Sequence, residues 1–227
     1  MIKIAVIWDL HGKDIWKKIT KDKSIDQFMF LWDYVDSFTV SDKKIVENLK
    51  EIINFKKEKP EKVVLLLWNH DVQYIYEWYN CSGKRKSYAR ILRDIFLKNL
   101  KLFKIMHQEW KYYFSHAWLT KEWIDDNITI LLRYGENFTE AINNILHSHH
   151  RYILMQVSPK RGWHNRASGP LWADKSETEH YVPDIDMHQI VWHTPVKSIK
   201  HFKYITYCDN LEHGNGEIFI LEVKENK

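Results

Sequence analysis

Short groups of carboxylates, imidazoles and one amide recur along the chain in an order that could build a metal centre. They are Asp9-x-His11, Asp33-x-x-Asp36, Asn69-His70-Asp71, His116 and His193. A ligand set of mixed nitrogen and oxygen donors suits Mn, Fe or Zn better than Ca. One such group alone is weak evidence, because a single buried histidine is more often a satisfied core residue than a ligand. Five groups, each at the end or turn of an expected element, predict a metal site.

The elements that must position these groups are strands that alternate with helices. Apolar runs rich in β-branched residues predict strands over 3–8, 62–68, 111–117, 189–194, 204–209 and 217–223. Helical spacing of apolar residues predicts helices over 41–58, 88–108 and 137–150, with Ser41 and Asn137 as N-caps. This order predicts an α/β fold with a mixed sheet or two sheets, and side chains at strand ends can converge at one sheet edge. Without a linker or a repeat, one domain over residues 1–227 is expected.

The composition is typical of a globular protein, and we expect a cytoplasmic one. The chain has 227 residues, of which 44% are hydrophobic and 28% charged, and its net charge is +4. No apolar run reaches the roughly 18 residues that a membrane span needs. The apolar run near the start ends on an acidic residue without a cleavage site, which indicates a core strand and not a signal peptide. Cys81 and Cys208 match no CxxC spacing, so thiols are expected.

The order of the motifs resembles that of the calcineurin-like metallophosphoesterases, in the phosphoprotein-phosphatase-like branch found in bacteria and phages. The family pattern is G-D-x-H-G, G-D-x-x-D, G-N-H-D/E, S-H-A-G and G-H-T. This chain reads W-D-L-H-G, W-D-Y-V-D, W-N-H-D, S-H-A-W and W-H-T, so the match covers nearly the whole chain. The resemblance implies an α/β calcineurin-like metallophosphoesterase fold, with two mixed β-sheets sandwiched between helices. It also implies a hydrolase that acts on phosphoric esters.

The resemblance further implies a role for each motif residue. The implied metal ligands are Asp9 and His11 for the first of two divalent ions, Asp33 as the bridge, and Asn69, His116 and His193 for the second. Mn is the favoured metal, with Fe or Zn as alternatives. The two ions would share a hydroxide and stabilise an in-line displacement at phosphorus. His70 would protonate the leaving group, oriented by Asp36 as its carboxylate partner.

One cation of the family pattern is missing. In many protein phosphatases an Arg follows the second Asp of the second motif and holds the substrate phosphate, and here that position is Ser37. Arg161 or Arg166 could bind the phosphate instead, because guanidinium groups form paired hydrogen bonds with it; a solvated loop arginine is equally expected for each. The basic stretch 81–90 could meet an anionic substrate or begin a solvated helix. The His-rich segment 147–150 ends a helical pattern and is not expected to bind metal.

Tryptophan stands where the family has glycine beside the metal and catalytic residues. The positions are Trp8, Trp32, Trp68, Trp118 and Trp192. The chain has 11 Trp and only 7 Gly, and glycine serves at such turns because the backbone needs positive φ or close approach. Overpacking by about 1–3 kcal/mol for each Trp would approach the stability margin of a whole protein.

Since every change has the same product, we hypothesise one cause: these codons are UGA, written here as Trp but decoded as Gly by the source organism. Trp163 is a sixth candidate. The residues expected to be genuine are Trp16, Trp123 and Trp172, and those left unassigned are Trp78 and Trp110.

These features leave three functions open. The favoured one is a dinuclear-metal phosphatase that acts on phosphate monoesters, in a phosphoprotein or a small phosphorylated molecule. A phosphodiesterase or nuclease on the same fold would need an extended basic groove, and the scattered charge argues modestly against it. The third is a non-catalytic binding protein whose site is closed by real tryptophans. Such a protein would be expected to lose metal-ligating residues as well, yet only glycines of the family pattern have changed. No membrane partner is expected, and a nucleic-acid partner is not favoured.

Overall fold

The computed structural model describes residues 1–8, 10–31, 34–37, 39–178, 187–193, 195–210 and 218–223. The chain divides into two compact units, and each has its own sheet. The first unit is Met1–Phe103 with Ile218–Lys227, and the second is Lys104–Glu217. Among the described residues, no helix has both the length and the apolar character needed to cross a bilayer. A single domain and a cytoplasmic location stay predictions.

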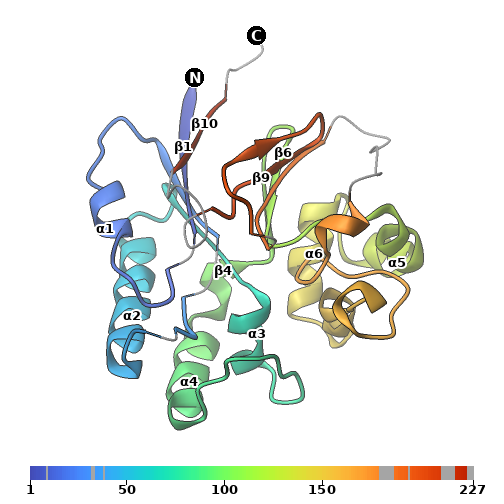
Figure 1. The fold of residues 1–227 in the computed structure, drawn as a ribbon, viewed down its shortest axis with the longest axis horizontal. Helices are drawn as coiled ribbons and strands as arrows, with labels where there is room; N and C mark the ends of the chain where they lie inside the picture. The colour runs from blue at the N-terminus through green and yellow to red at the C-terminus, as the bar shows by residue number, and fades with distance from the viewer. Residues whose placement is uncertain are drawn as a thin grey trace. The chain divides into compact units, whose positions relative to one another are not determined.

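The first unit is built on a mixed sheet with the strand order β10-β1-β2-β3-β4 (Figure 1). The strands are β1 (Ile2–Ile7), β2 (Gln27–Phe30), β3 (Val63–Leu66), β4 (Phe103–Lys104) and β10 (Phe219–Val223). β1, β2 and β3 run parallel, whereas β10 pairs antiparallel with β1. All of β3 and the last four residues of β1 are buried, as expected for parallel strands covered on both faces. The carboxyl ends of three parallel strands therefore meet at one edge.

The helices of the first unit follow these strands. They are α1 (Trp16–Ile19), α2 (Asp42–Glu58), α3 (Asn69–Ile75) and α4 (Ala89–Asn99), with 3₁₀ turns η1 (Lys86–Tyr88) and η2 (Leu100–Leu102). The predicted N-cap of α2 is confirmed, because the Ser41 side chain accepts a hydrogen bond from the Lys44 N–H. Ile45, Leu49 and Ile52 are buried on one face of this helix. α3 begins almost directly after β3, so its first residues stand at the strand's carboxyl end.

The second unit has a sheet with the strand order β5-β6-β7-β9-β8. Its strands are β5 (Met106–Glu109), β6 (Tyr112–Ser115), β7 (His188–Val191), β8 (Lys200–His201) and β9 (Ile205–Tyr207). β6, β7 and β9 are parallel, and β5 and β8 are antiparallel neighbours at the two edges. Its helices are α5 (Lys121–Tyr134) and α6 (Phe138–Leu146), with 3₁₀ segments η3 (His149–Met155), η4 (Pro159–Arg161) and η5 (Lys175–Glu177). α5 and α6 pack against each other (Figure 1).

Most of the predicted elements are present. Each predicted strand overlaps an observed one, the sheets are two and mixed, and Asn137 caps α6 through the Glu140 N–H. The predicted helix 88–108 was wrong beyond Asn99, where the chain turns into η2, β4 and β5. The Asn143 side chain accepts hydrogen bonds from the N–H groups of Ile105 and Met106, which holds this segment in extended form. The strand β2 and the helix α5 were not predicted.

Candidate active site

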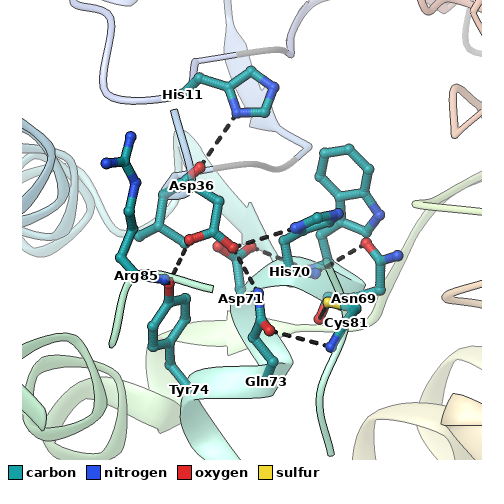
Figure 2. Close-up of polar contacts among 11 residues, drawn as sticks. His11, Asp36, Asn69, His70, Asp71, Gln73, Tyr74, Cys81 and Arg85 are labelled. Atoms are coloured by element: carbon teal, nitrogen blue, oxygen red, sulfur yellow. Dashed lines mark hydrogen bonds and ion pairs between the residues drawn. The ribbon is translucent and has the colours of Figure 1, made fainter. Parts of the chain in front are cut away.

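Four of the predicted site residues of the first unit lie at the carboxyl edge of its sheet. Asp36 follows β2, and Asn69 and His70 open α3 after β3 (Figure 2). His11 lies in the turn after β1 and donates from Nδ1 to the carbonyl of Val35 at 3.3 Å. Asp9 and Asp33 lie outside the described residues. The sheet therefore brings motif residues from three separate segments to one place.

His11 and Asp36 both have left-handed backbone conformations, with φ of 42° and 62°. Residues other than glycine adopt this region at a cost in free energy, and such strain is most often found at functional sites. The Nδ1–H of His11 is used by a backbone carbonyl, so the lone pair of this imidazole lies on Nε2. That arrangement is typical of histidines that bind a metal through Nε2.

The predicted pair of Asp36 and His70 is in contact. His70 Nδ1 lies 3.2 Å from Asp36 Oδ2. The Asp36 side chain is 1% exposed and that of His70 is 21% exposed, so the acid is buried and the imidazole can be reached from solvent. A carboxylate can only accept, so this hydrogen bond places the proton on His70 Nδ1.

Two residues that the sequence analysis missed complete the surroundings of Asp36. Gln73 Nε2 donates to Asp36 Oδ2 at 2.6 Å, and the Tyr74 hydroxyl donates to Asp36 Oδ1 (Figure 2). Burial and the hydrogen bond to Asp36 raise the pKa of Tyr74, so its hydroxyl stays protonated and remains a donor. Their positions, three and four residues after His70, are a helical spacing that could have identified them.

The start of α3 is held by buried polar contacts. Asn69 is 1% exposed, and its side-chain oxygen accepts from the backbone N–H of His70 at 2.9 Å. Asp71 accepts from the backbone N–H of Trp68 at 3.2 Å. Burial raises the pKa of Asp71 well above its usual range, and the nearby charge of Asp36 acts in the same direction. These contacts fix the first turn of the helix, and with it the backbone of His70.

In the second unit, His116 and His193 meet at the end of two neighbouring parallel strands. His116 follows β6 and is fully buried, and His193 follows β7. Their ring centroids are 4.4 Å apart and the rings are almost perpendicular. Two imidazoles so close together could both act as ligands of a transition metal such as Fe or Zn. Among the described residues, no group of three or more His, Cys, Asp or Glu is arranged around a common point.

The candidate phosphate-binding arginines of the second unit differ in their surroundings. Arg161 forms an ion pair with Asp174 at 2.8 Å and also lies 3.5 Å from the carbonyl of His193. Arg166 forms an ion pair with Asp126 of α5 at 2.7 Å. In the first unit, Ser37 accepts hydrogen bonds from two backbone N–H groups that follow it, so it closes a turn. Of the two arginines, Arg161 is the one that lies beside a predicted metal ligand, His193.

The segment 147–150 forms its own local contacts. His150 Nδ1 is hydrogen-bonded to the Tyr134 hydroxyl at 2.9 Å, and the rings of His149 and His150 are 3.9 Å apart. Cys81 and Cys208 are both thiols, as predicted. The basic stretch after α3 begins as a loop over Cys81–Arg85 and continues into η1 and α4.

The motif tryptophans are mostly enclosed. Trp8, Trp118 and Trp192 are 0%, 2% and 0% exposed, Trp68 contacts the His70 ring edge-on, and Trp32 lies outside the described residues. None of the four described ones has positive φ, so of the two expected reasons for glycine only close approach can apply at these four positions. The indole N–H of Trp8 makes no hydrogen bond to any described residue.

The tryptophans expected to be genuine give a contrast. Trp16 donates to the Asn48 side chain at 2.9 Å, and Trp123 donates to the carbonyl of Ile153 at 3.1 Å. Buried indole N–H groups normally have such partners.

Solved structures with the same fold are phosphatases. A point mutant of a cold-active protein tyrosine phosphatase superimposes with a TM-score of 0.65 at 16% identity, over 98% of this chain and 76% of that one. The cold-active protein tyrosine phosphatase of a psychrophilic Shewanella gives 0.63 at 15% identity, with the same coverage. A Saccharomyces cerevisiae serine/threonine phosphatase similar to human phosphatase PP5 gives 0.54 at 15% identity, over 91% and 66% of the two chains. No family model and no curated protein matches the sequence.

At such low sequence identity, the structural similarity is evidence for the fold alone. It confirms the predicted α/β, calcineurin-like metallophosphoesterase fold with two mixed sheets.

Proposed function

We propose that the chain is a metal-dependent phosphoesterase that hydrolyses phosphate monoesters. The observation that carries this proposal is the hydrogen bond between Asp36 and His70 at the carboxyl edge of the first sheet. It supplies an oriented imidazole for proton transfer, in a fold that this chain shares with phosphatases.

His70 would act as the general acid. Its Nδ1–H is donated to Asp36, so Nε2 is the ring nitrogen that can deliver a proton to the departing alkoxide. The buried carboxylate fixes the plane of the His70 ring through this hydrogen bond. An alkoxide leaves phosphorus poorly without a proton, and general acids of this kind contribute about 10²–10⁴-fold to rate.

Two divalent metal ions would be held by the residues that the family motifs assign. They are Asp9, His11, Asp33, Asn69, His116 and His193. The donors that the structure describes fit this role, since His11 is oriented through Nδ1 and the imidazoles of His116 and His193 adjoin each other. When bound, Mn, Fe or Zn supplies Lewis-acid stabilisation of the phosphoryl group and a nucleophile derived from water.

The substrate would be a phosphorylated protein or small molecule. The similar structures are those of protein tyrosine and serine/threonine phosphatases, which supports a phosphorylated substrate without deciding between a protein and a small molecule. Both arginines form ion pairs, with Asp174 and Asp126, but Arg161 is the better candidate for a phosphate contact because it also lies beside His193. A diesterase or nuclease remains the second candidate on this fold.

We further propose that the motif tryptophans are glycines in the natural protein, through UGA codons. The buried indole N–H of Trp8 supports this proposal, because an unsatisfied buried donor costs about 1–3 kcal/mol. The coding sequence tests it directly. UGA at positions 8, 32, 68, 118 and 192, with UGG at 16, 123 and 172, is the expected result, and UGG throughout would refute it.

The activity is tested by producing the chain twice, with Trp and with Gly at the five motif positions. Each protein is assayed with p-nitrophenyl phosphate and with bis(p-nitrophenyl) phosphate, with added Mn²⁺ and with EDTA. Release of p-nitrophenol from the monoester, dependent on Mn²⁺ and lost in His70→Asn, is expected. Preference for the bis-ester would favour the diesterase. A folded Gly version that cleaves neither ester would remove the enzyme proposal and leave the binding protein.

A further inference from the structure

The Asp36 carboxylate receives more hydrogen bonds than its pairing with His70 requires. Oδ2 accepts from His70 Nδ1 at 3.2 Å and from Gln73 Nε2 at 2.6 Å, and Oδ1 accepts from the Tyr74 hydroxyl (Figure 2). Asp36 is 3% exposed, Gln73 is 1% exposed and Tyr74 is 2% exposed. The acid is therefore held by side chains of α3 on both of its oxygens, in a place that solvent hardly reaches.

These donors come from one turn of one helix. Gln73 and Tyr74 follow His70 by three and four residues, so all three side chains share a face of α3. Asp36 comes from a different segment and has a φ of 62°. A left-handed residue other than glycine persists only where its surroundings hold it. The three donors of α3 are the contacts that can hold the Asp36 side chain in place.

The loop Cys81–Arg85 fixes the direction of each of these hydrogen bonds. The N–H of Cys81 donates to Gln73 Oε1 at 3.2 Å, and the N–H of Arg85 donates to the Tyr74 oxygen at 2.7 Å. A backbone N–H can only donate, so Gln73 must turn its NH₂ toward Asp36, and Tyr74 must turn its hydroxyl proton the same way. The orientation of the Gln73 amide thus follows from the chemistry of its two partners.

The same loop lies against the pair itself. Gly83 has a φ of +81°, and a Cβ built on it would lie 3.8 Å from Asp36 Cβ and from His70 Cε1 and Nδ1. Arg85 is also tied to α2 by an ion pair with Asp42 at 3.3 Å. The loop therefore covers the Nδ1 side of the imidazole, while its two ends bind Gln73 and Tyr74.

We propose that Gln73 and Tyr74 are positioning residues that hold Asp36, and through Asp36 keep the His70 proton on Nδ1 and Nε2 directed at the leaving group. This inference rests on the proposed function of His70 as general acid. It assigns a role to the loop Cys81–Arg85, which locks both side chains as donors. Neither Gln73 nor Tyr74 touches the substrate.

The kinetic test compares two leaving groups. Tyr74→Phe and Gln73→Leu are assayed with phenyl phosphate, whose phenoxide needs a proton, and with p-nitrophenyl phosphate, whose leaving group needs it less. We expect kcat for phenyl phosphate to fall about tenfold more than kcat for p-nitrophenyl phosphate, with KM little changed. Tyr88→Phe is the matched control, because the Tyr88 hydroxyl makes no hydrogen bond to any described residue, and it should leave both rates unchanged. Equal losses with both esters would overturn the proposal.

A second measurement needs no catalysis. In metal-free protein with ¹⁵N-labelled histidine, the His70 signals should show the Nδ1–H tautomer in the unaltered chain, and a mixture of tautomers in Tyr74→Phe and Gln73→Leu. An unchanged tautomer in both variants would overturn the proposal even where their folds are intact. If the unaltered chain cleaves neither ester, the enzyme proposal fails, and the tautomer alone then decides whether these residues position His70.

Discussion

Asp71 offers a sharp test of the electrostatics at the start of α3. Its side chain is fully buried, and the carboxylate accepts hydrogen bonds from the backbone N–H groups of Trp68 and Tyr34. Burial raises the pKa of this carboxyl well above its usual range. Asp71→Asn keeps an oxygen that can accept from Trp68 and removes the group that can ionise.

The sign of the effect follows from proton linkage. Between the pKa of about 3.9 in the unfolded chain and the raised pKa of Asp71, the folded state binds one more proton than the unfolded state. The stability that Asp71 contributes is therefore fully present below the unfolded pKa, and it is lost as the pH rises through the folded pKa. In that pH range, the free energy of unfolding falls by up to about 1.4 kcal/mol per pH unit because of this one carboxyl. The Asp71→Asn variant has no carboxyl at this position, so its free energy of unfolding lacks this pH dependence.

The assay is urea unfolding of both metal-free proteins at intervals from pH 4 to pH 8. We expect the free energy of unfolding of Asp71→Asn, relative to that of the unaltered chain, to increase with pH, by up to about 1.4 kcal/mol per pH unit. Asp125→Asn, on the exposed side of α5, is the matched control and should show no such trend near neutral pH. A stability difference between Asp71→Asn and the unaltered chain that stays constant from pH 4 to pH 8 would refute the reasoning.

Further predictions concern the pair, the metal donors and a turn. Asp36→Asn presents an NH₂ group to surrounding donors, so kcat for phenyl phosphate should fall by about 10²-fold or more, with steady-state kinetics as the measurement; an unchanged kcat would contradict the role of Asp36. His193→Ala removes one of two adjoining imidazoles, so titration calorimetry should show weaker Mn²⁺ binding, and equal affinity would count against the site. Trp110 has a φ of 56° in the two-residue turn between β5 and β6. Glycine adopts this conformation without strain, so Trp110→Gly should raise the free energy of unfolding by about 1 kcal/mol. A lower midpoint of thermal denaturation in this variant would disprove the prediction.

The sequence anticipated the elements whose signals are local. The strand predicted over 62–68 was found because a buried parallel strand is a continuous apolar run, and Ser41 was found because an N-cap precedes its helix. The short strand β2 lacks β-branched residues and was missed. The predicted helix ran too far because the segment after Asn99 is held in extended form at Ile105 and Met106 by Asn143, which is distant in sequence.

The candidate site shows the same division between local and distant information. Motif order placed Asp36 beside His70, and the structure has them in contact. Gln73 and Tyr74 were missed because no helix was predicted at Asn69–Ile75, where their spacing from His70 places all three on one face. That the loop 81–85 folds back onto this helix is not visible in the local sequence.

The strand β10 has a consequence for biosynthesis. It pairs with β1 along Ile2↔Val223 to Val6↔Phe219, so β1 leaves the ribosome long before the strand with which it pairs. Until then, one edge of β1 presents open backbone groups to other nascent chains. The second unit has all of its strands available earlier, because they lie between the two segments. A translation product that ends between β9 and β10 would therefore contain all strands of the second sheet. Its first sheet would lack β10, so β1 could pair with a strand from a neighbouring chain.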